Sequence, residues 1–256
     1  MTIQKQLWTI LVEQDEFISN TAVTLKEDEL HYIANVLRLK VGDDVEITNC
    51  RGLKCLAKIE VFTKKEAKLV ILNVLTQKKT SPEIHLYLAL PKPSTLEEVI
   101  ASVSEMGLDE IHIFRSEKCA SKAPVKLEKL ERISNEAVRI SKSAFSTKVF
   151  SYETMQDVFL KRKLQLENGL NLFCDESHVY ENKVTNSLLK ILQEKFNPQQ
   201  NINIFIGPEA SFSSIERDFI FNHLNCCAVS LGDNILRVPN AVYSALAIVN
   251  QVRITL

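Results

Sequence analysis

The 256-residue chain has 31 Lys and Arg against 32 Asp and Glu, and hydrophobic residues make up 45% of it. These values are ordinary for a globular protein, and the net charge of −1 excludes a polycation that binds nucleic acid with its whole surface. The longest apolar runs, such as residues 241–249, are too short to span a bilayer, and the N-terminal residues lack the pattern of a secretory signal peptide. We therefore expect neither a membrane anchor nor export.

Apolar residues in the first 76 positions occur in short alternating stretches, which are typical of half-buried strands. Three such stretches, separated by turn-forming residues, cover residues 44–49, 56–61 and 68–75. One helix is expected at residues 27–37. We predict a small β-barrel or curled sheet for residues 1–76 and a linker at residues 77–82.

Longer helical patterns alternate with buried strands after Pro82. The predicted strands cover residues 83–90, 109–114, 170–176, 201–207 and 226–232. The predicted helices cover residues 96–106, 125–144, 155–166 and 184–195, a segment opened by Ser213-x-x-Glu216, and residues 241–252. The first helix is expected to begin with a capping box, in which Ser94 or Thr95 pairs with a glutamate three residues later. This alternation predicts an α/β domain over residues 82–256, with a mostly parallel sheet covered on both faces.

Positive charge is concentrated in one part of the second half. Between Arg115 and Lys148 the chain has nine Lys and Arg but only four Glu, an excess of five positive charges. A local basic patch on a nearly neutral protein favours a polyanionic partner that is contacted on one face. The alternative, an ordinary solvated helix surface, stays open for this segment alone.

The six cysteines and five histidines show none of the spacings typical of a metal site or a disulfide framework. There is no CxxC pair and no HExxH motif. Thiols without such pairing suit the reducing cytosol. We expect a cytoplasmic protein without a metal.

Three loops follow strands at the edge of the sheet where ligands bind in open α/β folds. They come after Leu90, after Ile206 and after Leu231. No GxGxxG or GxxxxGK[ST] motif is present, which argues against a dinucleotide or nucleoside triphosphate site. The lack of a GxSxG motif argues against an α/β-hydrolase.

Two of these loops carry motifs that resemble a known family. IGPEASFSSIE (206–216) and VSLGDNILRVPNA (229–241) are similar to the paired C-terminal signatures of SPOUT-class ribosomal RNA methyltransferases. The nearest pattern is that of the enzymes that methylate N3 of a uridine in small-subunit ribosomal RNA. HYIANVLRLKVGD (31–43), LALPKPSTLEEVIASVSEMGLDEI (88–111) and NEAVRISKSA (135–144) resemble further segments of that family, so the likeness extends in order along nearly the whole chain.

The resemblance implies a PUA-like, RNA-binding β-barrel at residues 1–76. It also implies a SPOUT α/β domain at residues 82–256 with a C-terminal trefoil knot, which binds S-adenosylmethionine and forms a homodimer. The implied partner is small-subunit ribosomal RNA, either naked or within the 30S particle. A flipped uridine is the kind of substrate that such a pocket accepts.

Seven residues of the two loops are expected to bind the cofactor: Gly207, Pro208, Glu209, Leu231, Gly232, Ile235 and Leu236. S-adenosylmethionine has no phosphate, so it needs an apolar slot, hydrogen-bond partners for adenine and ribose, and a place for a sulfonium. Glycine lets the backbone approach the ligand closely. Glu209 suits a ribose hydroxyl or the sulfonium, although a carboxylate that interacts with a helix end is the alternative.

Arg237 is the candidate catalytic residue, because a guanidinium at the pocket mouth stabilises a deprotonated uracil or grips a phosphate. The alternative for Arg237 is a surface or dimer-interface arginine, and no residue is identified as the general base. Four cations are expected to contact RNA: Arg38 and Arg51 on the barrel, and Arg139 and Lys142 on the basic helix.

The chain departs from the family pattern at three places. GPEAS stands for GPEGG, LRVPNA for LR-x-E-T-A, and RISKSA for EQS-x-R. A positive φ at Ala210 or Ser211 would cost roughly 1 kcal/mol or more, because these residues have a Cβ atom. Two alternatives to a working enzyme therefore stay open: an RNA-binding paralogue with weak or no activity, and an α/β enzyme that acts on another small substrate.

Overall fold

The computed structural model describes residues 7–119, 123–174 and 186–255. Internal contacts divide the chain into two units. The first contains residues 1–79 and 135–146, and the second contains residues 80–134 and 147–256. The predicted division assigned residues 135–146 to the second domain, whereas their contacts group them with the first unit.

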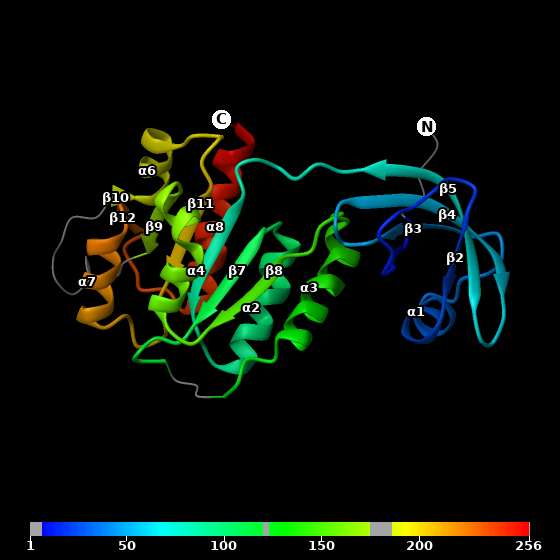
Figure 1. The fold of residues 1–256 in the computed structure, drawn as a ribbon, viewed down its shortest axis with the longest axis horizontal. Coiled ribbons are helices and arrows are strands. Elements are labelled where there is room, and N and C mark those ends of the chain that lie inside the picture. Colours follow the sequence, from blue (N-terminus) through cyan, green and yellow to red (C-terminus); the bar gives the residue numbers. More distant parts are fainter. Residues whose placement is uncertain (1–6, 120–122, 175–185, 256) are drawn as a thin grey trace. The chain divides into compact units, whose positions relative to one another are not determined.

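The first unit is built on a five-stranded sheet in the order β1-β3-β4-β5-β2 (Figure 1). Its strands are β1 (Thr9–Leu11), β2 (Ala22–Leu25), β3 (Asp44–Thr48), β4 (Leu53–Phe62) and β5 (Ala67–Thr76). Neighbouring strands are antiparallel except β1 and β3, which are parallel. Alternate residues of β3, β4 and β5, such as Ile47, Ile59 and Leu69, form the core. The alternating pattern therefore predicted these three strands, but β1 and β2 were not predicted.

The predicted helix at residues 27–37 consists of two parts. The α-helix α1 (Glu27–His31) continues as a π-helix, η1 (Tyr32–Val36). Leu30 and Ile33 are its buried residues and pack on the sheet.

The second unit contains a seven-stranded sheet in the order β10-β12-β9-β11-β6-β7-β8. Its strands are β6 (Ile84–Ala89), β7 (Glu110–Phe114), β8 (Lys148–Tyr152), β9 (Leu170–Cys174), β10 (Asn186–Ser187), β11 (Ile202–Ile206) and β12 (Cys226–Ser230). Every neighbouring pair is parallel, as predicted. The carboxyl ends of these strands therefore lie at one edge, where ligands bind in such sheets. β8 and β10 were missed from the sequence, and the helix predicted at residues 184–195 was wrong at 186–187, which form β10 before α6 begins at Leu188.

Helices cover both faces of this sheet (Figure 1). They are α2 (Pro93–Glu105), α3 (Leu127–Ser141), α4 (Met155–Glu167), α6 (Leu188–Lys195), α7 (Ser214–His223) and α8 (Val238–Thr255). Residues of α2, α6 and α8 pack with alternate residues of β6, such as Leu86 and Leu88. Residues of α4 and α7 pack with Tyr87 and Ala89 on the opposite face. Within the described ranges, no helix is both long and apolar enough to cross a bilayer.

Helix starts were predicted with mixed success. At α7, Ser213 and Glu216 form the predicted capping box. The capping box predicted at Ser94 or Thr95 was wrong, because α2 begins at Pro93 and its N-cap Lys92 makes no side-chain cap. Proline at the first helical position is already set to a helical φ and has no N–H to satisfy, so the helix starts before the serine.

Candidate functional site

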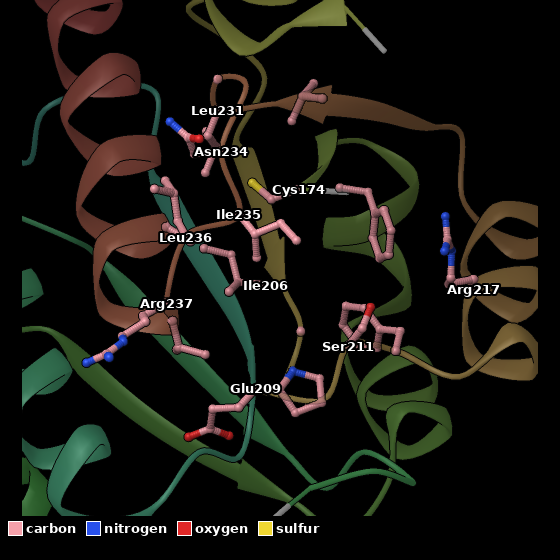
Figure 2. A pocket seen from close by; sticks show the side chains of 18 residues that line it. Cys174, Ile206, Glu209, Ser211, Arg217, Leu231, Asn234, Ile235, Leu236 and Arg237 are labelled. Atoms are coloured by element: carbon pink, nitrogen blue, oxygen red, sulfur yellow. The ribbon is translucent and has the colours of Figure 1, made fainter. Parts of the chain in front are cut away.

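A cavity of about 250 Å³ lies at the carboxyl ends of β9, β11 and β12, beside the start of α8 (Figure 2). The loop after β11 and the loop after β12 form its opposite walls, and β9 lies between their strands in the sheet. The lining residues include Gly207, Pro208, Glu209, Leu231, Gly232, Ile235, Leu236 and Arg237. These eight are all the cofactor-binding and catalytic candidates identified from the sequence. The structure thus brings them together, while their binding of a cofactor stays a prediction.

The loop after Leu90, the third predicted loop, contributes none of the described residues that line this cavity. β6 is beside β11 on the side away from β9, and β11 and β9 separate it from β12. The sequence could not show this, because strand order is not encoded in local patterns.

The first wall is a tight turn. The N–H of Ser211 donates to the carbonyl oxygen of Pro208 at 2.9 Å, and Ser211 has a φ of +61°. Serine stands here where the family pattern has glycine, and its Cβ atom makes this left-handed conformation cost roughly 1–2 kcal/mol of stability. Neither Ala210 nor Pro239 lines the cavity.

The ring of Phe212 packs against Gly207 in this wall. A Cβ atom on Gly207 would lie 3.0 Å from each of two ring carbons of Phe212, so only glycine fits there without displacing the ring. The ring is 5% exposed and lies beside Phe173, with 5.2 Å between ring centroids, and Phe114, at 6.3 Å. Sequence reasoning missed Phe212, although it stands within the quoted motif.

Cys174 and Arg217 also line the cavity and were not predicted, whereas Asn234, a further lining residue, lies within the loop segment 231–236 that was expected to meet the adenine edge. Arg217 comes from α7, where its N–H donates to the carbonyl oxygen of Ser213, and in Figure 2 it lies at the right of the view. Arg237 precedes α8, and its carbonyl accepts a hydrogen bond from the N–H of Ala241 at 2.9 Å. The backbone of Arg237 thus belongs to the first turn of α8, and its side chain is exposed. In Figure 2 its guanidinium lies at the left of the labelled side chains and points away from Ile206 and Ile235.

The four predicted RNA contacts fall into two classes. Arg38 and Arg51 are exposed, and the ion pair of Arg51 with Asp15 is at the surface, with side chains 58% and 89% exposed. RNA contact by these two residues stays a prediction.

Arg139 and Lys142, in contrast, are used inside the first unit. The Arg139 side chain, 9% exposed, bonds to Glu29 and Glu136 and lies over the ring of Tyr32, with 4.2 Å between the guanidinium carbon and the ring centroid. Lys142 Nζ donates to the carbonyl of Leu7 and to Thr9 Oγ1, both at 2.9 Å. These contacts indicate structural roles and do not favour the predicted RNA contacts of these two residues.

A buried polar group lies near the amino ends of β6 and β7, at the edge opposite the cavity. One ligand atom from each of His85, Glu110 and His112 lies within 4.8 Å of the others, an arrangement that could hold a metal ion and that no sequence motif indicated. The guanidinium of Arg162, on α4, donates to the Glu110 carboxylate and already supplies positive charge there. The prediction of a protein without a metal stays a prediction.

Burial and charge shift the pKa values of this group in opposing ways. Burial raises the pKa of Glu110, but the hydrogen bond with His112 and the charges of His85 and Arg162 outweigh it and lower the pKa to about 2. Burial lowers the pKa of His112 to about 4, although Glu110 opposes this effect. At neutral pH the carboxylate is ionised and His112 is neutral, with its Nδ1 3.0 Å from the hydroxyl of Tyr152.

Comparison with known proteins gives a consistent result. A family model described as an RNA methyltransferase domain matches residues 78–250, and one described as an RNA methyltransferase PUA domain matches residues 25–72. The chain is 29% identical over 229 residues to ribosomal RNA small subunit methyltransferase E of Rickettsia conorii, covering 89% of each protein. It is 29% identical over 241 residues to the protein of the same name from Synechocystis, covering 94% of this chain and 76% of the relative.

Two solved structures have the same fold. The ribosomal RNA small subunit methyltransferase E of Neisseria gonorrhoeae, bound to S-adenosyl methionine, matches with a TM-score of 0.78 at 20% identity, over 96% of this chain and 98% of its own. A probable rRNA-methyltransferase from Porphyromonas gingivalis matches with a TM-score of 0.80 at 25% identity, over 97% and 99%. The predicted PUA-like unit and SPOUT α/β domain are thereby confirmed, whereas the trefoil knot stays a prediction. With the family model covering residues 78–250, the chain belongs to the RNA methyltransferase family.

Proposed function

We propose that this chain transfers a methyl group from S-adenosylmethionine to N3 of a uridine in small-subunit ribosomal RNA. The observation that carries the proposal is that the loops after β11 and β12 line one and the same cavity. Family membership and the names of the relatives support the reaction, and the cofactor bound in the Neisseria gonorrhoeae structure supports the donor. A ribosomal RNA substrate also fits the expected cytoplasmic location.

The residues of the cavity suit this cofactor. Its walls are largely apolar, with Ile206, Ile235 and Leu236 available for an adenine ring, and backbone groups of the loop after β12 available for the ring edge. The cavity volume of about 250 Å³ is close to the lower end of the range for small-molecule sites. Glu209 is exposed and offers a carboxylate to a ribose hydroxyl or a cationic sulfur. When bound, S-adenosylmethionine supplies an electrophilic methyl group.

Arg237 is the residue of this chain best placed to act on the acceptor. N3 of uracil must lose its proton before it becomes a nucleophile, and the resulting negative charge spreads to the carbonyl oxygens. A guanidinium that donates hydrogen bonds to such an oxygen stabilises the anion and favours proton loss to solvent or to a base. Arg237 thus orients the uracil and lowers the cost of its deprotonation.

A second candidate function is an RNA-binding paralogue with weak activity, and the replacement of two glycines of the family pattern by Ala210 and Ser211 is the observation that favours it. Calorimetric titration with S-adenosylmethionine separates the two, because a silent titration would support the paralogue. Incubation of undermethylated 30S particles with protein and cofactor, followed by mass spectrometry of the RNA, tests the reaction. A methylated uridine is expected, and unmodified RNA after binding of the cofactor would contradict the proposed activity.

The protein is further proposed to act as a homodimer through α8. One face of α8 packs in the core, including Val242, Leu246 and Val249, while Ile254 is 68% exposed. Light scattering in solution tests this arrangement, and a monomer at micromolar concentration would contradict it.

A further inference from the structure

The loop that follows β7 is held against the cavity wall by one buried carboxylate. Glu216, on the first turn of α7, is 7% exposed. Its carboxylate accepts hydrogen bonds from Ser116 Oγ at 2.9 Å and from the N–H of Glu117 at 3.0 Å. It also accepts one from the N–H of Ser213 at 2.9 Å, which completes the cap of α7. One side chain thus joins two segments that are 100 residues apart in the sequence.

The loop held in this way, Arg115–Cys119, brings two cations and one exposed carboxylate, Glu117, to the border of the cavity. Arg115 is paired with Glu153, and Lys118 is the second cation. Lys118 is exposed, and its Nζ donates to the carbonyl oxygen of Phe212 at 3.4 Å. Phe212 itself lines the cavity, whereas none of the described residues of Arg115–Cys119 does. The loop therefore lies next to the cofactor pocket without forming part of its wall, at the start of the most basic part of the sequence.

We propose that Arg115–Cys119 is an RNA-contacting border of the methyl-transfer pocket, and that Glu216 is the positioning residue that fixes it there. This inference rests on the proposed function, since it assumes that RNA approaches the cavity. Contacts to phosphates fix the register of a nucleic acid on a protein, so a cation beside the pocket must itself be fixed to place one nucleotide over the pocket. Hydrogen bonds to an ionised acceptor are short and strong, which suits a buried carboxylate to this task.

For Glu216→Gln, a positioning role and simple electrostatics predict opposite changes in RNA affinity, so this substitution distinguishes them. Removal of a negative charge near an RNA site should tighten binding of the polyanion. In Glu216→Gln, however, the amide oxygen can keep only part of the carboxylate's contacts, and the amide nitrogen must face an N–H or hydroxyl donor. The loop Arg115–Cys119 then loses part of its hydrogen bonding to α7. If Glu216 positions this loop, RNA binding should therefore weaken even though the variant has one negative charge fewer.

The experiment measures the affinities of the full chain for undermethylated small-subunit RNA and, separately, for S-adenosylmethionine. For Glu216→Gln we expect RNA affinity about tenfold weaker, as for the loss of a charge-assisted hydrogen bond, and unchanged cofactor affinity. The matched control is Asp157→Asn, which removes a carboxylate from the same position of the capping box of α4, where Asp157 bonds only within its own cap. This control should bind RNA as the unchanged protein does.

Two further variants keep the proposal testable if Glu216→Gln does not fold. Ser116→Ala removes the loop's hydroxyl donor but leaves the α7 cap intact, and it should weaken RNA binding without affecting the cofactor. Lys118→Ala should reduce the slope of log affinity against log salt by about 0.7, the value for one lost phosphate contact to single-stranded RNA.

The outcomes separate the inference from the proposed function. RNA binding by Glu216→Gln that equals or exceeds that of the unchanged protein would overturn the inference, as would parallel loss of RNA and cofactor. An unchanged protein that binds no S-adenosylmethionine would instead overturn the proposed function. In that case the RNA affinities of the variants still decide whether Glu216 positions an RNA-binding loop.

Discussion

Substitution of Gly207 by alanine should damage the cavity through a single contact. The added Cβ would lie 3.0 Å from two carbons of the Phe212 ring, whereas carbon atoms pack best at about 3.5–4.0 Å. The ring must therefore move by roughly 0.5 Å or more, or the loop must move instead. Because the ring is buried between Phe114 and Phe173, it cannot yield freely. Overpacking of this kind costs about 1–3 kcal/mol.

This cost should appear in two measurements. In a chain of this size each kcal/mol lowers the melting temperature by about 2–4 °C, so a decrease of at least about 2 °C is expected. If the wall shifts, calorimetric affinity for S-adenosylmethionine should fall about tenfold, which corresponds to about 1.4 kcal/mol.

Gly42→Ala in the first unit provides the control for the contact, because no atom lies within 4 Å of its added Cβ. Unlike Gly207, Gly42 has a positive φ, +93°, so its substitution strains the backbone without a steric contact. That variant should lose stability by about 1 kcal/mol and bind the cofactor normally. The reasoning about Phe212 would be refuted if Gly207→Ala melted and bound the cofactor as the unchanged protein does.

Three other substitutions or conditions have expected results. Arg237→Ala should abolish methylation measured by mass spectrometry while calorimetric cofactor affinity is retained, and loss of both would show a structural role. Stability to denaturant should fall as the pH decreases from about 6.5 to 4, because burial lowers the pKa of His112 to about 4 and the unfolded chain takes up the proton first. Stability should fall further from pH 4.5 to 2, because the lowered pKa of Glu110 stabilises the folded state only while its carboxylate is ionised. His112→Gln should flatten the dependence of stability on pH between 6.5 and 4, and an unchanged slope there would contradict the assignment of this range to His112. Arg139→Ala should lower the free energy of unfolding by about 3 kcal/mol in urea titrations, since it leaves Glu29 without its buried partner, and a loss below 1 kcal/mol would show that the pair is solvated.

The strands that could be predicted in the second unit are those with continuous apolar runs. β6, β7, β9 and β11 are buried over most of their length, and β12, with one buried and four half-buried residues, was recognised from its largely apolar composition. β8, by contrast, has one exposed and two half-buried residues among its five, because it is an edge strand of the sheet. Such a mixed pattern does not differ enough from that of a loop.

The charged residues show where sequence reasoning ends. Arg139 was taken as an RNA contact because it stands on a basic helix, and the same charge could equally serve an ion pair. Its partner Glu29 lies 110 residues earlier in the chain, and no local pattern indicates such a pair. Glu216 illustrates the same point, since its capping role was visible within four residues and its bond to Ser116 was not.

The cavity loops also explain why one family glycine can be replaced and another is retained. Ser211 has a φ of +61°, close to the left-handed region near +57° that L-residues reach at moderate cost. Gly232 has a φ of +136°, far beyond that region, where a side chain would be strained although no neighbour lies within 4 Å of its added Cβ. The departure at Ser211 thus costs stability at a φ that an L-residue can adopt, whereas a replacement of Gly232 would strain the backbone well outside that region. Because the glycine that the loop geometry requires is present, the loop geometry favours a working enzyme over an inactive paralogue.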